Sequence, residues 1–209
     1  MQIPQKIRYR YIENQVLKIF TKLPAEKRRL PVNMNDIVGL RNDCVITTYQ
    51  EFSVQFKIPV SKVIKLNESV SGCLHYDPES RHYIIMYNKR ACEGRKNWTQ
   101  AHELGHVFLG HSLMIEGSHI AEDDIYFSRY PLLEKEADYF ASILLAPPPV
   151  LKALHIHSED EIRCLCGLSG AAAGYQYESL LRSGNCITSW DHDMIHIFQS
   201  FISSYKSKL

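Results

Sequence analysis

The sequence lacks the features that mark membrane, secreted and strongly charged proteins. Its 24 basic and 23 acidic residues nearly cancel, giving a formal net charge of +1 over 209 residues. This balance provides no overall field to hold nucleic acid, so we expect no direct nucleic-acid partner. No apolar run approaches the roughly 18 residues of a membrane span. Residues 1–10 contain no apolar stretch of the kind that a signal peptide needs. We therefore expect a cytoplasmic protein with no membrane partner.

Cysteine appears without a pattern. The six cysteines form no C-x-x-C pair and lack the density of a secreted disulfide scaffold, so we expect reduced thiols. Hydrophobic residues make up 45% of the chain and charged residues 22%, the proportions of an ordinary globular protein. The length suits one domain, or one domain with an appendage.

The most informative feature that is present is an H-E-x-x-H sequence at residues 102–106. On a helix, His102 and His106 lie on one face, because residues four apart stack on each other. They can bind one metal ion together, with Glu103 beside them as a candidate general base. The alternative is a buried helix with two hydrogen-bonded histidines, but an acid in an otherwise apolar turn needs a partner. The motif therefore predicts the working part of a zinc hydrolase.

The helix that carries this motif is expected from Trp98 to Leu109. Asn97 is its predicted N-cap, and Gly110 lies just past its C-terminal end. Residues 94–96 are expected to form a polar linker. The helix is apolar nearly all round, which indicates burial in the core of a domain.

Two histidines do not complete a catalytic zinc site, which usually has three protein ligands and one open position. The metzincin pattern would place glycine at position 109 and histidine at position 112. The chain has Leu109 and Ser112 there, so this pattern is rejected. His111 is expected to pack or hydrogen-bond at the end of the helix.

A better source for the third ligand is the segment from Pro131 to Ala146. Its first residue is proline and three prolines follow it, which indicates a helix. Glu134 and Asp138 lie four apart on one face, whereas Glu136 points about 160° away. We predict Glu134 as the third metal ligand, with Asp138 accepting a hydrogen bond from a ligand histidine. Glu136 remains the reserve ligand, and a solvated acidic turn at the helix N-terminus is the alternative.

Strands are expected upstream of the motif. Residues 43–49 are rich in β-branched side chains, and Gly72–Tyr76 and Arg81–Asn88 flank a turn and predict a hairpin. We expect the second hairpin strand to lie at the edge of the sheet beside the metal helix. There its backbone can pair with an extended peptide substrate. The alternative is a strand that is paired on both sides.

Together these segments resemble the ImmA/IrrE family of metallopeptidases. Residues 99–106, TQAHELGH, match the family's T-x-A-H-E-L-G-H helix, and residues 134–147 match its E-x-x-A-N/D-x-F-A-x-x-L-L-x-P helix. Residues 84–88, IIMYN, are similar to the family's strand that ends in asparagine. The resemblance implies an α+β, zincin-like fold, with a small, mostly antiparallel sheet whose edge strand lies beside a buried H-E-x-x-H helix. It also implies a zinc site of two histidines and one glutamate, and cleavage of a bacterial or phage regulator.

We expect two parts of the chain: a zincin-like metallopeptidase domain over residues 1–150, and a helical C-terminal extension over residues 151–209 that packs on it. Within the extension, Glu159–Cys166 and Gly170–Arg182 resemble a helix-turn-helix in outline. The second of these helices carries little positive charge, so we expect it to pack or bind a partner and not to read DNA.

The expected function is a zinc-dependent endopeptidase with one zinc ion and a protein substrate, a repressor-like regulator. The alternative is a non-catalytic metal-binding module of a phage or mobile-element switch, but metal binding alone does not need Glu103. A histidine or tyrosine in the segment that connects the two helices, residues 110–130, is expected to stabilise the oxyanion of a tetrahedral intermediate. The sequence leaves four candidates for this role: His111, His119, Tyr126 and Tyr130.

Overall fold

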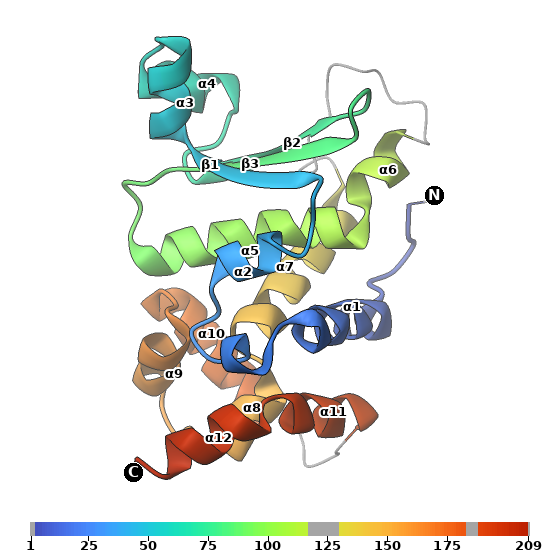
Figure 1. The fold of residues 1–209 in the computed structure, drawn as a ribbon, viewed down its shortest axis with the longest axis vertical. Coiled ribbons are helices and arrows are strands. Elements are labelled where there is room, and N and C mark those ends of the chain that lie inside the picture. The colour runs from blue at the N-terminus through green and yellow to red at the C-terminus, as the bar shows by residue number, and fades with distance from the viewer. Residues whose placement is uncertain (1–2, 117–129, 183–187, 209) are drawn as a thin grey trace.

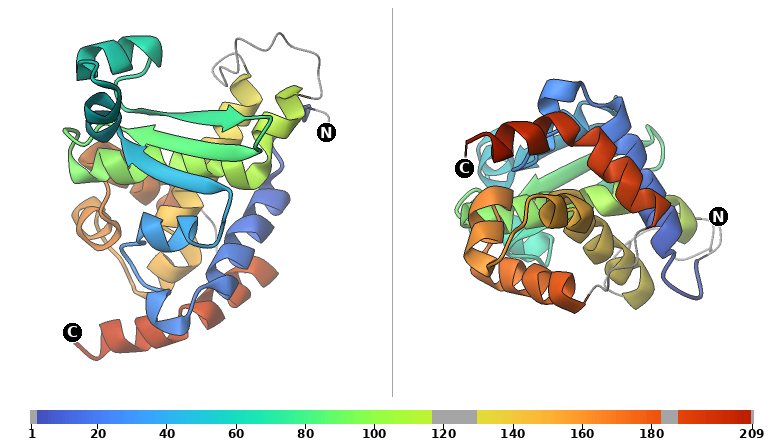
Figure 2. Two further views of the ribbon diagram at one scale, coloured as in Figure 1. Left: turned by 45° about the horizontal axis from the view of Figure 1, so that its top comes forward. Right: turned by 90° about the horizontal axis from the view of Figure 1, so that it is seen from below.

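The computed structural model of the protein describes residues 3–116, 130–182 and 188–208. The fold is α+β and mostly helical, with one three-stranded sheet in the described residues. The sheet covers one side of helix α5 (Glu93–Leu109), while α1 (Tyr9–Lys22) and the C-terminal helices lie on the other side (Figure 1; Figure 2). Helix α7 (Pro131–Leu145) packs against both α5 and α1. Helix α5, which carries the H-E-x-x-H sequence, therefore runs through the middle of the molecule, as its apolar surface predicts.

The sheet has the order β1-β3-β2 and is mixed. Strands β2 (Gly72–Asp77) and β3 (His82–Tyr87) form the expected antiparallel hairpin. Strand β1 (Cys44–Thr48) adds in parallel on the far side of β3. The prediction that the second hairpin strand is an edge is therefore wrong, because β3 is paired on both sides. The edge strand that contacts α5 is β2.

Helix α5 begins earlier than predicted, so residues 94–96 are its first turn and not a linker. The N-cap residue is Cys92, and Asn97 is helical. The Asn97 side chain, which was expected to cap the helix, instead donates a hydrogen bond to the Gly167 carbonyl at 2.9 Å. Gly167 lies 70 residues further along the chain. The end is as predicted, because Gly110 has the left-handed conformation (φ 72°) that glycine favours.

The remaining elements before α7 are short. Two helices lie within residues 49–66, on either side of Pro59, and Thr48 caps the first of them in a capping box with Glu51. These elements are η1 (Ala25–Lys27), α2 (Met34–Val38), α3 (Tyr49–Phe56), α4 (Val60–Leu66) and α6 (His111–Glu116).

The C-terminal helices share their core with the rest of the molecule. One cluster of buried apolar side chains includes Ile12 and Phe20 of α1 together with Ile162 and Phe198. The rings of Phe20 and Phe198 meet edge to face, with centroids 4.8 Å apart. The helices are α8 (Pro148–Ala153), α9 (Glu159–Cys166), α10 (Gly170–Arg182), α11 (Ser189–Ile197) and α12 (Gln199–Lys206).

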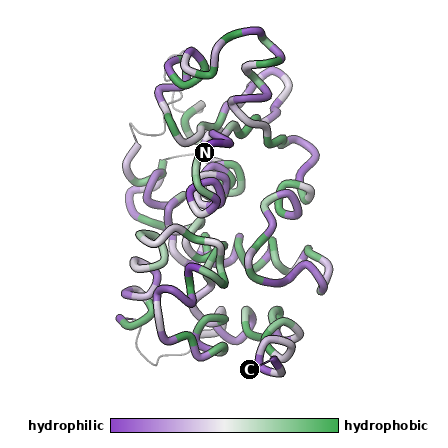
Figure 3. Tube along the Cα trace, turned by 90° about the vertical axis from the view of Figure 1, so that its left-hand side faces the viewer, coloured by the Kyte–Doolittle hydropathy of each residue, from purple (hydrophilic) through white to green (hydrophobic). Residues whose placement is uncertain are grey.

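Polar and apolar residues are interspersed along the described parts of the trace (Figure 3). Among residues 3–116, 130–182 and 188–208, no helix combines the length and the apolar character needed to cross a bilayer. Five of the six cysteines lie in this described part of the chain, and none of these five forms a disulfide.

Candidate metal centre

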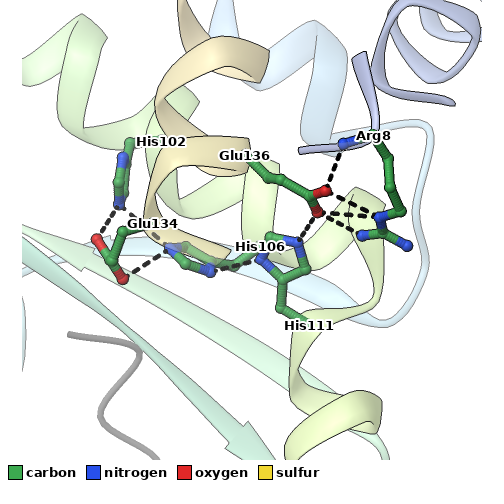
Figure 4. A network of polar contacts seen from close by, with 6 residues as sticks. All are labelled: Arg8, His102, His106, His111, Glu134 and Glu136. Atoms are coloured by element: carbon green, nitrogen blue, oxygen red, sulfur yellow. Dashed lines mark hydrogen bonds and ion pairs between the residues drawn. The ribbon is translucent and has the colours of Figure 1, made fainter. Parts of the chain in front are cut away.

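Three side chains from two helices converge on one point. His102 and His106 project from α5, and Glu134 projects from the first turn of α7 (Figure 4). Nε2 of His102 lies 3.2 Å from Nε2 of His106 and 3.2 Å from Oε2 of Glu134. Nε2 of His106 lies 3.4 Å from Oε1 of Glu134. Within the described residues, these three form the group of histidine, cysteine and acidic side chains that could hold a metal ion.

The spacing of these atoms fits a small tetrahedral ion. Zinc binds nitrogen and oxygen ligands at roughly 2.0–2.1 Å, so neighbouring ligand atoms of a tetrahedral site lie about 3.3–3.4 Å apart. The 3.2 Å between the two Nε2 atoms agrees with that edge length, and Glu134 places one carboxylate oxygen 3.2 Å from His102 Nε2 and the other 3.4 Å from His106 Nε2. Two imidazoles and one carboxylate also match the donor set of catalytic zinc sites, which leave one position open.

The close approach of helices α5 and α7 depends on two small residues. A Cβ atom placed on Gly105 would lie 3.0 Å from Cα of Ala137 and 3.2 Å from its carbonyl oxygen. The lack of a side chain at Gly105 thus brings α7 near enough for Glu134, one turn before Ala137, to face the histidines.

The second ring nitrogen of His102 is held by Asp138, from the next turn of α7. Nδ1 of His102 lies 2.9 Å from Oδ1 of Asp138. Because a carboxylate only accepts, this ring nitrogen carries the proton and donates it. In the neutral ring, the form that binds metal, this tautomer has its lone pair on Nε2, directed at His106 and Glu134. This contact is the one expected of Asp138.

His106 is held from its other side by a chain of polar groups. Its Nδ1 lies 2.9 Å from Nδ1 of His111, and Nε2 of His111 lies 3.2 Å from Oε2 of Glu136. Glu136 in turn accepts hydrogen bonds from the Arg8 guanidinium and the Arg8 backbone N–H. All six residues of the centre and this chain are shown together in Figure 4.

The electrostatics favour neutral His106 and a positive charge near His102. Burial, followed by the neighbouring His102 and His111, holds the pKa of His106 well below its usual range. Burial alone would lower the pKa of His102, but Asp138 and Glu134 outweigh it and raise that pKa to about 10. A neutral imidazole is the form that binds metal, and a metal cation can take the place of the proton that these acids attract to His102.

Glu103 has the character of a general base. Burial raises its pKa to about 7, against the opposing effect of His102. A group whose pKa lies near the working pH can both take up and release a proton, which is what general acid–base catalysis requires.

The other predicted site residues in the described chain are not part of this three-residue group. Glu136, the reserve ligand, is fully buried in its ion pair with Arg8. His111 is buried, with its two ring nitrogens facing His106 and Glu136. Tyr130 is the N-cap residue of α7 and packs against a small cluster around Met114. Two further oxyanion candidates, His119 and Tyr126, lie outside the described residues.

Sequence reasoning missed Arg8 and the link between His111 and Glu136. The available signal was Glu136 itself, an acid on a helix face that continues into apolar residues, since a buried carboxylate needs a cationic partner. The partner could not be identified, because Arg8 lies 128 residues away in sequence.

Comparisons with known proteins agree with this geometry. Residues 56–169 match the peptidase M78 family model, described as an IrrE N-terminal-like domain. Among solved structures, a Mycobacterium tuberculosis transcriptional regulator is similar in fold, with a TM-score of 0.50 and 13% identity. The alignment covers 86% of this chain but 49% of that one, so the chain spans about half the length of this neighbour. No curated protein matches the sequence.

Proposed function

Because the chain belongs to the peptidase M78 family of IrrE N-terminal-like domains, we propose that it is a zinc-dependent endopeptidase acting on a protein substrate. The observation that carries the proposal is the set of ligand-atom separations of 3.2–3.4 Å among His102, His106 and Glu134, with Glu103 on the next position of the same helix. These residues would hold one zinc ion. When bound, it supplies Lewis acidity, which polarises the scissile carbonyl and lowers the pKa of water toward about 7.

The chain's own groups have separate tasks in this proposal. Glu103 takes the proton from the attacking water and delivers it to the leaving amine, which its raised pKa of about 7 allows. Asp138 keeps His102 in the tautomer with a lone pair on Nε2. The outer edge of β2, next to α5, offers unpaired backbone groups to an extended peptide, in the role first assigned to β3.

The substrate that we propose is a transcriptional repressor or regulator of a bacterium or phage. Two findings support it: the family membership, and a fold neighbour whose name is transcriptional regulator. The cytoplasmic location of such a substrate matches the location expected from the sequence.

Replacing Glu103 with glutamine tests catalysis apart from metal binding. We expect the variant to bind one zinc ion like the wild type, because Glu103 is not a ligand, and to lose roughly 10²–10⁴-fold in peptide cleavage, the usual contribution of a general base. Zinc content is measured by mass spectrometry, and cleavage by product analysis on a mixture of unfolded proteins. Unchanged cleavage in the variant would contradict the mechanism, and a zinc-loaded wild type that cleaves nothing would favour the non-catalytic metal-binding module.

A further inference from the structure

The N-terminal segment of the chain is tied to the interior of helix α7 by one arginine. The Arg8 backbone N–H donates to Oε1 of Glu136 at 2.8 Å, and its guanidinium Nε donates to the same oxygen at 2.9 Å. A third bond joins Nη2 to Oε2 at 2.5 Å. The Glu136 side chain is fully buried, so it depends on Arg8 for its counter-charge.

Glu136 is more than the partner of an ion pair, because it also orders the protons of two histidines. Its Oε2 accepts from Nε2 of His111 at 3.2 Å. Neutral His111 then has a lone pair on Nδ1, which accepts from Nδ1 of His106 at 2.9 Å. His106 must therefore carry its lone pair on Nε2, the atom that faces His102 and Glu134. The Glu136 carboxylate at the end of this series of hydrogen bonds thus determines which ring nitrogen of each histidine carries the proton.

We propose that Arg8, Glu136 and His111 form a positioning relay that fixes the tautomer and ring orientation of His106 for metal binding. The relay rests on the proposed function and adds to it a role for the N-terminal segment. Arg8 lies outside the residues that match the family model, 56–169. None of the three residues is a ligand or a catalytic residue, since each acts through His106.

The simpler alternative is that Arg8 and Glu136 only fasten the start of α1 to α7. The two roles predict different results. A fastening contact contributes to the stability of the metal-free protein and leaves the intrinsic metal affinity unchanged. A positioning relay changes metal affinity, because outer partners of metal-binding histidines typically contribute 10- to 100-fold.

The test compares three relay variants, Arg8→Met, Glu136→Gln and His111→Phe, with a matched control, Arg41→Met. Arg41 makes a similar ion pair with Asp43, and its side chain is 27% exposed against 25% for Arg8, but it has no place in the relay. For each full-length protein, the zinc dissociation constant is measured by competition with a chelator. The visible spectrum of the cobalt(II)-loaded protein reports the ligand geometry, and thermal unfolding of the metal-free protein reports stability.

We expect the relay variants to bind zinc roughly 10- to 100-fold more weakly and to have altered cobalt spectra. Arg41→Met should keep the wild-type zinc affinity and cobalt spectrum, whatever its effect on unfolding. Arg8→Lys, which keeps the charge but not the forked geometry, should recover part of the lost affinity.

Zinc affinities within about threefold of wild type in Arg8→Met and Glu136→Gln would overturn the relay while leaving the proposed function in place. An equal loss in Arg41→Met would also overturn it, because the effect would then be a general consequence of losing an ion pair. A wild-type protein that binds no zinc would overturn the proposed function, and the relay with it.

Discussion

At the scale of single residues, the positions of the imidazole protons decide which nitrogen of each histidine is free to bind a metal. Two carboxylates, Asp138 and Glu136, lie at opposite ends of the site and each draws one imidazole proton away from the centre. In the neutral rings, the Nε2 lone pairs of His102 and His106 both face Glu134. A bound cation would stabilise this arrangement, whereas without one the lone pairs repel each other.

Asp138→Asn tests the His102 side of this arrangement. The neutral amide accepts a weaker hydrogen bond than a carboxylate, so we expect zinc affinity to fall roughly 10- to 100-fold. The control is Asp160→Asn on α9, where the aspartate is exposed and forms an ion pair with Arg163 of the same helix. Chelator competition measures the zinc affinity of both variants. An unchanged affinity in Asp138→Asn would show that Asp138 has no role in metal binding.

At the scale of elements, the candidate metal centre depends on how closely α5 and α7 approach. Gly105→Ala introduces a methyl group about 3.0 Å from the backbone of Ala137, tighter than ordinary contact. Helix propensity favours alanine by about 1 kcal/mol, but overpacking against a backbone costs about 1–3 kcal/mol. We expect lower thermal stability and weaker zinc binding, because any outward shift of α7 moves Glu134 with it.

Gly170→Ala is the matched control for this change. Gly170 begins α10, and an added Cβ there meets nothing within 4 Å. We expect a stability equal to wild type or higher by about 0.4–1 kcal/mol. If Gly105→Ala were as stable and bound zinc as well as Gly170→Ala, the close helix approach would have no part in the site.

At the scale of the whole molecule, zinc should stabilise the fold by mass action. Free zinc at 100 times its dissociation constant contributes about 2.7 kcal/mol. For a chain of this size, about 2–4 °C per kcal/mol gives an increase in melting temperature of roughly 5–11 °C. Calorimetry with and without a chelator measures this increase in melting temperature. The Glu134→Ala variant, which lacks the proposed third ligand, should show little of it.

The division into residues 1–150 and a helical extension over 151–209 remains a proposal, and Phe198 offers a test of how the two parts cooperate. Phe198 is fully buried against Phe20 of α1. We expect Phe198→Ala to destabilise the whole protein by about 3–5 kcal/mol, with one unfolding transition followed both by circular dichroism and by zinc release. Tyr175→Ala, at a position that is 63% exposed, is the control. Two separate transitions would indicate that the extension folds independently.

The sequence was sufficient to predict those features that depend on residues close together in the chain. The i, i+4 spacing places His102 over His106 on any helix, and Pro131 and the three prolines after Ala146 set the limits of α7. Glycine at position 110 ends α5 for the same kind of reason. The motif-bearing helices, the hairpin and the pairing of Glu134 with the histidines could all be anticipated from such signals.

Tertiary structure decided what depends on partners distant in sequence. Strand β3 became central because β1, nearly forty residues earlier in the chain, pairs with its open side, and a hairpin sequence does not say which of its strands receives a third. Asn97 lies inside α5, which begins at Glu93, and its side chain bonds the distant Gly167 carbonyl and not the end of its own helix. Arg8 reaches Glu136 across 128 residues, and only folding brings that charge to the buried carboxylate behind the candidate metal centre. Spacing along each of two helices thus indicated which side chains could bind a metal, and long-range packing determined how those side chains are held.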